Sequence, residues 1–352
     1  MQKDKLLLVL LAIFIVLLPA AYLMGLISID TITIWGRYLC FAIAAIGVDL
    51  IWGYTGIMSM CQAFFFCLGA YGMGMYLTLY NLPETSAVPL FMEWNSIESL
   101  PLFWQPFQTF AGAIIATIVV TILFASISNF IFRRRIKGVF FAIITQAIAW
   151  AMFLLFSRNE TLLGGTNGLT NFQSFMGLDL RQDAVKMGFY IVTVIVLAAI
   201  YIGSKKLTQS KFGKLLIAVR DSESRLRFTG YKVSNFQTAI FIIGALIAMV
   251  AGMLYLPQTG IVTPGRMDVR ASIEMLIWVA LGGRGSLKGA VIGALIVNLL
   301  YSFFTSLMPD AWPYILGALY VITVLYLDKG VLGLGEIIKS KLKIKGFKFS
   351  KM

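Results

Sequence analysis

The stretch FQTFAGAIIATIVVTILFASISNFIF occupies residues 107–132, and the basic run RRRIK follows it directly at residues 133–137. The stretch carries no charged residue. About 20 apolar residues let a helix cross roughly 30 Å of hydrocarbon, so we predict that this stretch spans a membrane. The basic run predicts that its end is cytoplasmic, because Lys and Arg are retained on that side during insertion.

Similar apolar stretches recur along the 352 residues, of which 59% are hydrophobic and 13% are charged. This composition is typical of membrane proteins rather than of soluble domains. We therefore predict an all-α polytopic membrane helical bundle. The predicted spans are residues 6–26, 31–52, 61–80, 107–132, 138–156, 187–203, 236–256, 290–307 and 313–327. The first is too long for the core of a signal peptide, so we expect it to be retained.

Positive charge gathers on alternate connections between these stretches. Residues 133–137, 205–232 and 329–352 are rich in Lys and Arg, whereas residues 81–106 carry three acidic residues and no basic one. We therefore predict that both termini are cytoplasmic and that residues 81–106 and 157–186 lie outside. The formal net charge of +13 then reflects membrane orientation rather than nucleic-acid binding. The basic residues that fall elsewhere are Arg37, Arg158, Arg181, Lys186, Arg266 and Arg270.

A further apolar piece, residues 273–281, is too short to cross as a straight helix. It must nevertheless cross if the chain is to end on the side of its basic tail, so we predict a short or broken helix buried among the others. That gives about ten crossings. We expect one membrane domain, residues 1–352, with a basic cytoplasmic tail at 329–352.

The ten crossings divide into halves at about residues 1–156 and 187–328. An odd number of crossings in each half gives the halves opposite orientations, as in the inverted repeats of many transporters. Two short connections would then be equivalent, each ahead of an irregular third helix. They are Tyr54-Thr55-Gly56 and Gln258-Thr259-Gly260.

The residue types present argue against an enzyme. The chain has no His, which excludes histidine acid–base catalysis and histidine metal ligation. Its cysteines, Cys40, Cys61 and Cys67, lie in apolar stretches and are expected to pack rather than to bind metal. The glycine cluster at residues 282–289 lacks the Gly-Lys-Ser/Thr ending of a phosphate-binding loop, so we expect a turn there and neither ATP nor another cofactor on this chain.

Polar residues inside the predicted spans are candidates for the transport pathway. Glu274 could bind a substrate, cap a broken helix or pair with Arg270, whereas Asp49 lies near a span end and is expected to be structural. Gln62 has helix–helix hydrogen bonding as its default role.

The outside loop at residues 159–170 contributes further pathway candidates. It carries Thr166 and Asn167 among three glycines and could present hydrogen-bonding groups to a small neutral ligand, or could be an ordinary turn. Trp150 and Trp278 are candidates for aromatic walls of the pathway.

A mixed-charge segment at residues 211–230 lies on a predicted cytoplasmic connection. It interleaves acidic and basic residues, has a partly apolar face and ends with Gly230, which can terminate a helix. It predicts a short helix that either lies on the membrane lipid surface or docks a partner protein. The candidate docking residues are Arg220, Asp221, Glu223, Arg225 and Gly230.

Several motifs, in this order, resemble the LivM-type permeases of ATP-binding-cassette importers of branched-chain amino acids. They are Gly53-Tyr-Thr-Gly56, Lys137-Gly-Val-Phe-Phe-Ala-Ile-Ile-Thr145, Gly164-Gly-Thr-Asn-Gly168-Leu-Thr, Ala218-Val-Arg-Asp-Ser-Glu223, Ser272-Ile-Glu274 and Gly282-Gly-Arg-Gly285. Within the family the chain is most similar to the urea-type branch. Where members often have Gly-His, this chain has Cys61-Gln62.

The resemblance implies a multi-pass permease subunit of the bacterial inner membrane. Its partners would be a second related permease, two cytoplasmic ATPases that bind ATP and Mg, and an external solute-binding protein. Asp221 and Glu223 would lie on its coupling helix. Urea is the expected substrate, because a zwitterion needs charged partners in the pathway and only Glu274 and Asp49 are considered available there. The alternatives are branched-chain amino acids or another small amide, or, in a different class, an ATP-independent channel or secondary transporter.

Overall fold

Long apolar helices make up most of the computed structural model, which describes residues 13–83, 86–136, 138–326, 330–331 and 333. Within these residues seven helices are long and apolar enough to cross a membrane. They are α3 (Ile29–Thr55), α4 (Gln62–Tyr80), α6 (Phe110–Arg133), α7 (Val139–Ser157), α8 (Asp183–Gln209), α10 (Val233–Thr259) and α12 (Leu287–Leu307). The prediction of a polytopic helical membrane protein is confirmed.

Three shorter helical segments complete the set predicted from the sequence. They are η2 (Ile13–Leu17) continuing into α2 (Leu18–Leu23), α11 (Val269–Gly282) and α13 (Trp312–Tyr326). Each predicted span therefore has a helix, including the short piece at 273–281, which becomes α11. The first part of the predicted first span, Lys137 and most of the predicted basic tail lie outside the described residues.

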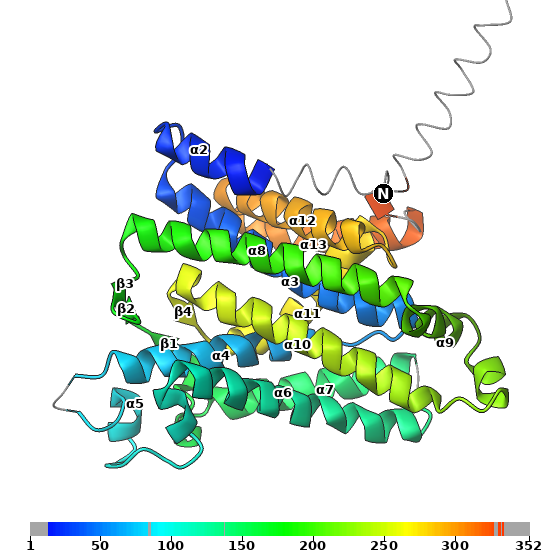
Figure 1. Cartoon of the computed structure of the whole chain (residues 1–352), viewed down its shortest axis with the longest axis horizontal. Helices are drawn as coiled ribbons and strands as arrows, with labels where there is room; N and C mark the ends of the chain where they lie inside the picture. The colour runs from blue at the N-terminus through cyan, green and yellow to red at the C-terminus, as the bar shows by residue number, and fades with distance from the viewer. Residues whose placement is uncertain (1–12, 84–85, 137, 327–329, 332, 334–352) are drawn as a thin grey trace, which may run out of the picture.

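The two ends of the bundle differ (Figure 1). One end, called here the basic end, carries Arg133, Arg134 and the helix α9 (Lys211–Phe228). The other, the loop end, carries the short elements. These are α5 (Leu90–Glu93), η3 (Gln105–Gln108), η4 (Asn159–Thr161), η5 (Gly165–Asn167), η6 (Pro264–Met267), η7 (Pro309–Ala311) and the strands β1 (Leu169–Thr170), β2 (Ser174–Phe175), β3 (Leu178–Asp179) and β4 (Ile261–Val262).

Two strand pairs order the loop end. Strands β1 and β4 pair antiparallel with Leu169 opposite Val262, and β2 pairs antiparallel with β3. The first pair joins the outside loop of the first half to the segment that leads into α11. This pairing was not predicted from the sequence, because two-residue strands are too short to show a period.

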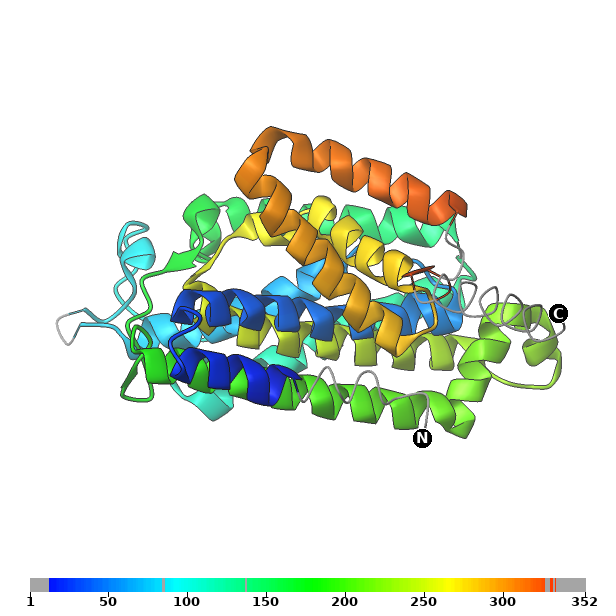
Figure 2. The same cartoon turned by 90° about the horizontal axis from the view of Figure 1, so that it is seen from above.

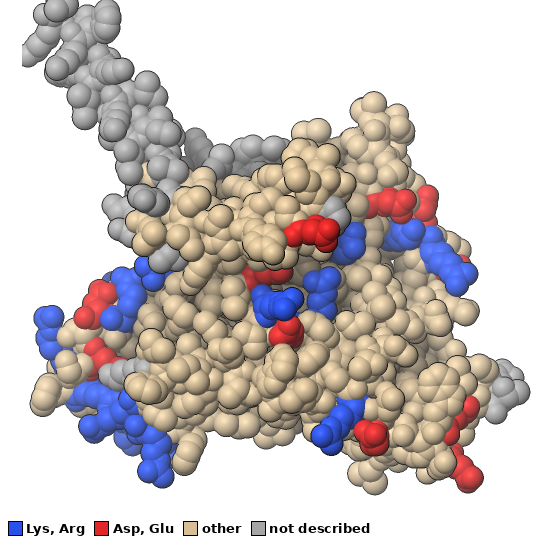
Figure 3. Space-filling view, turned by 180° about the vertical axis from the view of Figure 1, so that it is seen from behind, with Lys and Arg blue, Asp and Glu red and all other residues tan. Residues whose placement is uncertain are grey.

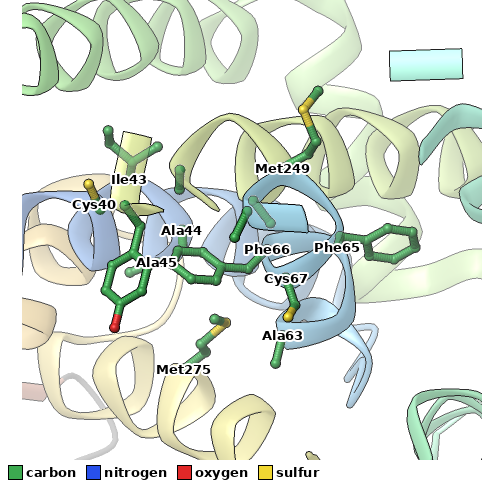
Figure 4. Close-up of a cluster of buried hydrophobic side chains, with 14 of the residues drawn as sticks. Cys40, Ile43, Ala44, Ala45, Ala63, Phe65, Phe66, Cys67, Met249 and Met275 are labelled. Atoms are coloured by element: carbon green, nitrogen blue, oxygen red, sulfur yellow. The ribbon is translucent and has the colours of Figure 1, made fainter. Parts of the chain in front are cut away.

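The core lies where α3, α4, α10 and α11 meet. Helices α3 and α4 are buried over most of their length, whereas α6, α7 and α8 expose most of theirs. Helix α13 lies on the side opposite α2 and α8, and α12 runs diagonally between these two sides (Figure 2). Phe66, Met249 and Met275 interlock with residues of α3 at the centre (Figure 4). At Gly69 the backbone of α10 comes so close that a methyl group would overlap the Met249 carbonyl, which is how small residues let membrane helices pack.

Helices α3 and α10 have matching features and run in opposite directions (Figure 1). Each has 27 residues and ends at a left-handed glycine, Gly56 with φ 74° and Gly260 with φ 71°, whose N–H donates to the carbonyl four residues back. Irregular chain follows each glycine before α4 or α11 begins. Helix α10 packs on α4 and α6, while α3 packs on α11 and α12. These reciprocal contacts agree with the predicted inverted repeat.

The separation of the two ends generates a labelling prediction. Ser96 and Gln173 are exposed at the loop end, and Lys214 is exposed at the basic end. In a background without the three buried cysteines, Ser96→Cys and Gln173→Cys should react with an impermeant thiol reagent in intact cells. Lys214→Cys should react only after permeabilisation. The reverse pattern would invert the predicted orientation.

Candidate functional site

A cavity opens beside the broken helix α11. Because α11 has only 14 residues and follows irregular chain, it begins inside the bundle and leaves space at its first turns. The cavity has a volume of about 170 Å³ and lies between α3, the end of α10, η6, α11, α12 and α13. Its lining residues are Arg37, Tyr38, Phe41, Phe66, Tyr255, Arg266, Ala271, Glu274, Met275, Trp278, Val297, Asn298, Tyr301, Ser302 and Trp312.

Charges of both signs line this cavity. Arg37 comes from α3, Arg266 from η6 and Glu274 from α11. Seen from behind, acidic and basic atoms gather in a hollow near the middle of a mostly uncharged face (Figure 3). The Arg37 Nε atom is buried and has no hydrogen-bond partner within the described part of the chain. Ionisable groups at membrane depth are costly, so such a cluster indicates a binding site or pathway.

Aromatic rings form one wall of the cavity. The Phe41 ring centroid lies 5.1 Å from that of Trp278 and 5.2 Å from that of Tyr255, which in turn lies 5.2 Å from Phe66. The Arg266 guanidinium sits over the Tyr255 ring, 5.6 Å from its centroid. The cavity therefore offers charged groups directly beside an aromatic surface, an arrangement suited to a small amphipathic ligand.

The structure brings together only two of the six pathway residues predicted from the sequence. Glu274 and Trp278 line the cavity. Trp150, on α7, is not among the lining residues and is 47% exposed. Gln62 is buried at the start of α4, where its Nε2 lies 3.5 Å from Ser59 Oγ, and is not part of the cavity lining.

Thr166 and Asn167 are likewise placed away from the cavity lining. Both are exposed in η5 at the loop end. The loop that carries them is nevertheless held against the segment before α11 by the β1–β4 pair. Any role of these two residues would therefore concern access from the loop end rather than contact with a ligand in the cavity.

Sequence reasoning missed Arg37 and Arg266. Both were among the basic residues that lie outside the cytoplasmic connections, and Arg37 falls inside a predicted span. A basic residue inside a span is a sign of a functional site, and this sign could have identified Arg37. The considered pairing of Arg270 with Glu274 is not seen among the described residues. Arg270 instead lies 3.9 Å from Asp268 and its side chain is 92% exposed.

Three segments meet at the basic end in what we call the junction, formed by Asp49, Gly53, Arg220 and Gly285. The Asp49 Oδ1 atom accepts a hydrogen bond of 2.7 Å from the Gly285 N–H. The Arg220 Nη1 atom donates one of 2.9 Å to the Gly53 carbonyl. The predicted structural role of Asp49 thus has a specific partner, and the glycine cluster at 282–289 forms the predicted turn between α11 and α12.

Helix α9 differs from the prediction in shape. It ends at Phe228, and Gly230 follows with φ +87° as the predicted terminator. The helix is bent at Ser222, whose backbone is not helical (φ −161°, ψ 74°), so the predicted single helix is two pieces. The bend falls between Asp221 and Glu223, where a straight helix was expected.

The candidate docking residues of α9 divide between its two pieces. Arg220 holds the Asp221 carboxylate with an Nε–Oδ1 distance of 2.9 Å and turns its Nη1 inward to the junction. Beyond the bend, Arg225 donates to the Ser222 hydroxyl at 2.8 Å, and Arg227 Nε lies 2.9 Å from the Glu223 carboxylate. The second piece therefore pairs Arg227 with Glu223 within itself and presents an apolar tip, with Phe228 92% exposed.

The chain is similar in sequence to named permease proteins. Residues 30–325 match the family described as the permease component of the branched-chain amino acid transport system. The high-affinity branched-chain amino acid transport system permease protein BraD of Pseudomonas aeruginosa is 24% identical over 311 residues, which cover 85% of this chain and 93% of that protein. LivM of Escherichia coli, a permease protein of the same description, is 23% identical over 371 aligned residues. The alignment covers 97% of this chain and 77% of that protein.

A more distant similarity extends to a sugar transporter. The fructose import permease protein FrcC of Rhizobium meliloti is 27% identical over 195 residues, covering 52% of each chain. No solved structure matches the chain.

The close packing of the junction generates a stability prediction. A methyl group on Gly53 would overlap both Asp49 Oδ1 and the Gly285 nitrogen. Gly53→Ala should therefore lower the free energy of unfolding by about 1–3 kcal/mol, the usual cost of overpacking. Thermal unfolding of the purified variant and of the unmodified protein measures this loss of stability. Gly203→Ala is the matched control, because Gly203 lies in α8 with open space around it and should tolerate the methyl group. Equal melting temperatures for the two variants would contradict the packing argument.

Proposed function

The chain belongs to the family of permease components of branched-chain amino acid transport systems, and from this premise we propose that it carries branched-chain amino acids in an ATP-driven importer. It is a transport subunit and not an enzyme. The names of BraD and LivM support the amino acid substrate, which was the alternative on sequence grounds. The expected urea specificity finds no support among these relatives.

One observation carries the choice of substrate: the cavity holds charges of both signs beside an aromatic wall. The sequence argument for urea depended on a shortage of charged partners, and Arg37 and Arg266 remove that shortage. In the proposed binding mode the substrate carboxylate contacts Arg37 and Arg266, and its ammonium group contacts Glu274. Charge-assisted hydrogen bonds of this kind are stronger than neutral ones.

The substrate side chain would lie on the aromatic wall formed by Phe41, Tyr255 and Trp278. A branched aliphatic group gains from leaving water for such a surface, at about 25 cal/mol per Å² buried. Urea has no apolar part to place there and no charge to match three ionisable side chains. The neutral solute would leave those side chains without partners, which is costly at membrane depth.

We propose that the chain works with the partners that the family membership implies. These are a second permease subunit, two cytoplasmic ATPases that bind ATP and Mg, and an external solute-binding protein. The basic end would face the cytoplasm and the ATPases, and the loop end would face the binding protein. The chain would lie in the inner membrane with both termini cytoplasmic. What supports this orientation is the concentration of Lys and Arg at the basic end.

Uptake by the reconstituted complex tests this function. Proteoliposomes containing all partners should take up labelled leucine in an ATP-dependent way and should not take up urea. Leucine uptake without ATP would indicate a channel or secondary transporter. Urea uptake without leucine uptake would restore the urea assignment, and fructose uptake alone would indicate a sugar permease like the named relative.

Charge removal in the cavity tests the binding mode. Arg37→Gln and Glu274→Gln should each reduce leucine uptake by about tenfold or more, because breaking one side of a buried charge pair typically costs about 2–5 kcal/mol. Trp278→Leu should also reduce uptake, whereas Trp150→Leu is the matched control and should leave it unchanged, since Trp150 faces away from the cavity. Full leucine uptake by both charge variants would rule out this cavity as the substrate site.

A further inference from the structure

We propose that Arg220 is not an ATPase contact but a positioning residue that links α9 to both helices lining the charged part of the cavity. The inference rests on the proposed ATP-driven function and concerns how motion at the basic end reaches the substrate. It starts from two hydrogen bonds of the junction, Arg220 to Gly53 and Asp49 to Gly285.

The bond from Arg220 satisfies the end of α3. Gly53 lies in the last turn of that helix, where carbonyl groups have no helical N–H partner. A cation at a helix C-terminus is also favoured by the helix dipole. The Arg220 side chain passes close over Gly56, which has a left-handed backbone. A methyl group added to Gly56 would lie only 3.2 Å from Arg220 Cγ. The guanidinium is thus fixed to α3, although the whole side chain is 40% exposed.

The second bond joins α3 to the turn before α12. Asp49 is fully buried one helical turn from Gly53, and its Oδ1 holds the Gly285 N–H at 2.7 Å. A methyl group added to Gly285 would lie 3.4 Å from the Gly53 carbonyl oxygen and 3.7 Å from Arg220 Nη1, so Gly285 is next to both residues. The three segments therefore meet at one point, where two hydrogen bonds join them.

Both helices that leave this point reach the charges of the cavity without interruption. On α3 the chain runs from Gly53 back to Arg37, about 24 Å at 1.5 Å per residue. On α11 it runs from Gly282 back to Glu274, about 12 Å. A displacement of the junction is consequently carried by two rigid helices to the groups that would hold the carboxylate and the ammonium of the substrate.

The bend at Ser222 separates two tasks within α9. The first piece holds Arg220 at the junction, and the piece after the bend carries Glu223 and the exposed Phe228. A partner bound to the second piece would move the first piece, which holds Arg220, and α9 as a whole contacts α3, α8 and α10. The arrangement assigns docking to the residues after the bend and transmission to Arg220.

The experiment uses the complete reconstituted complex and measures leucine uptake and ATP hydrolysis together. Arg220→Ala should still copurify with the ATPases and hydrolyse ATP at close to the normal rate, but leucine uptake per ATP should fall by about tenfold. Arg220→Lys should recover part of the coupling, because an ammonium can also donate to the Gly53 carbonyl. Lys214→Ala is the control, since Lys214 is an exposed basic residue on the same helix, and its coupling should be normal.

Several results would overturn the inference. Normal uptake per ATP in Arg220→Ala would show that the bond to Gly53 transmits nothing. Loss of the ATPases from that variant would show that Arg220 is a docking residue after all. A lower melting temperature with unchanged uptake per ATP in Arg220→Lys and Arg220→Ala would mean that Arg220 only caps the end of α3 and stabilises the fold. Failure of the proposed function itself is distinguishable, because the unmodified complex would then take up no leucine with ATP.

Discussion

The structure depends on one constraint: the hydrocarbon of a membrane offers no water to satisfy backbone N–H and C=O groups. Helices satisfy this constraint alone, and so most of the chain is helical. The two breaks after Gly56 and Gly260 are possible only inside the bundle, where side chains replace the missing partners. Thr145 Oγ1 accepts the Met60 N–H at 3.0 Å, and Ser272 Oγ accepts the Ala63 N–H at 3.2 Å. These hydroxyl groups satisfy N–H groups that follow the first break, and the second break, before α11, opens the cavity.

The broken helices also determine where charge can be placed. A continuous helix in the position of α11 would fill the space that Arg37, Arg266 and Glu274 share. Because the chain enters α11 through η6, Arg266 reaches the cavity from irregular backbone while Glu274 reaches it from the helix. The break between α10 and α11 thus leaves space for the cavity, and the segments beside it supply two of the three charged residues, Arg266 and Glu274.

The sequence was a good guide to the helices and a poor guide to the cavity. Helix length and apolar content are local properties, so even the short α11 was predicted. The direction of a side chain in a membrane bundle is not local, since both faces of a span are apolar. Trp150 and Trp278 both lie in predicted membrane segments, yet one is 47% exposed and the other 3%. Arg220 was assigned to a cytoplasmic partner from its mixed-charge surroundings, which do not reveal its contact with Gly53, 167 residues away in the chain.

The pair β1–β4 has a consequence for how the two halves of the chain are joined at the loop end. Its strands have only two residues each, and so short a ladder is weak by itself. Leu169 and Val262 are, however, both buried, and both pack beside Gly74 of α4. Side-chain packing therefore supports the ladder, and together they act as a brace between the loop at residues 159–170 and the segment that leads through η6 into α11.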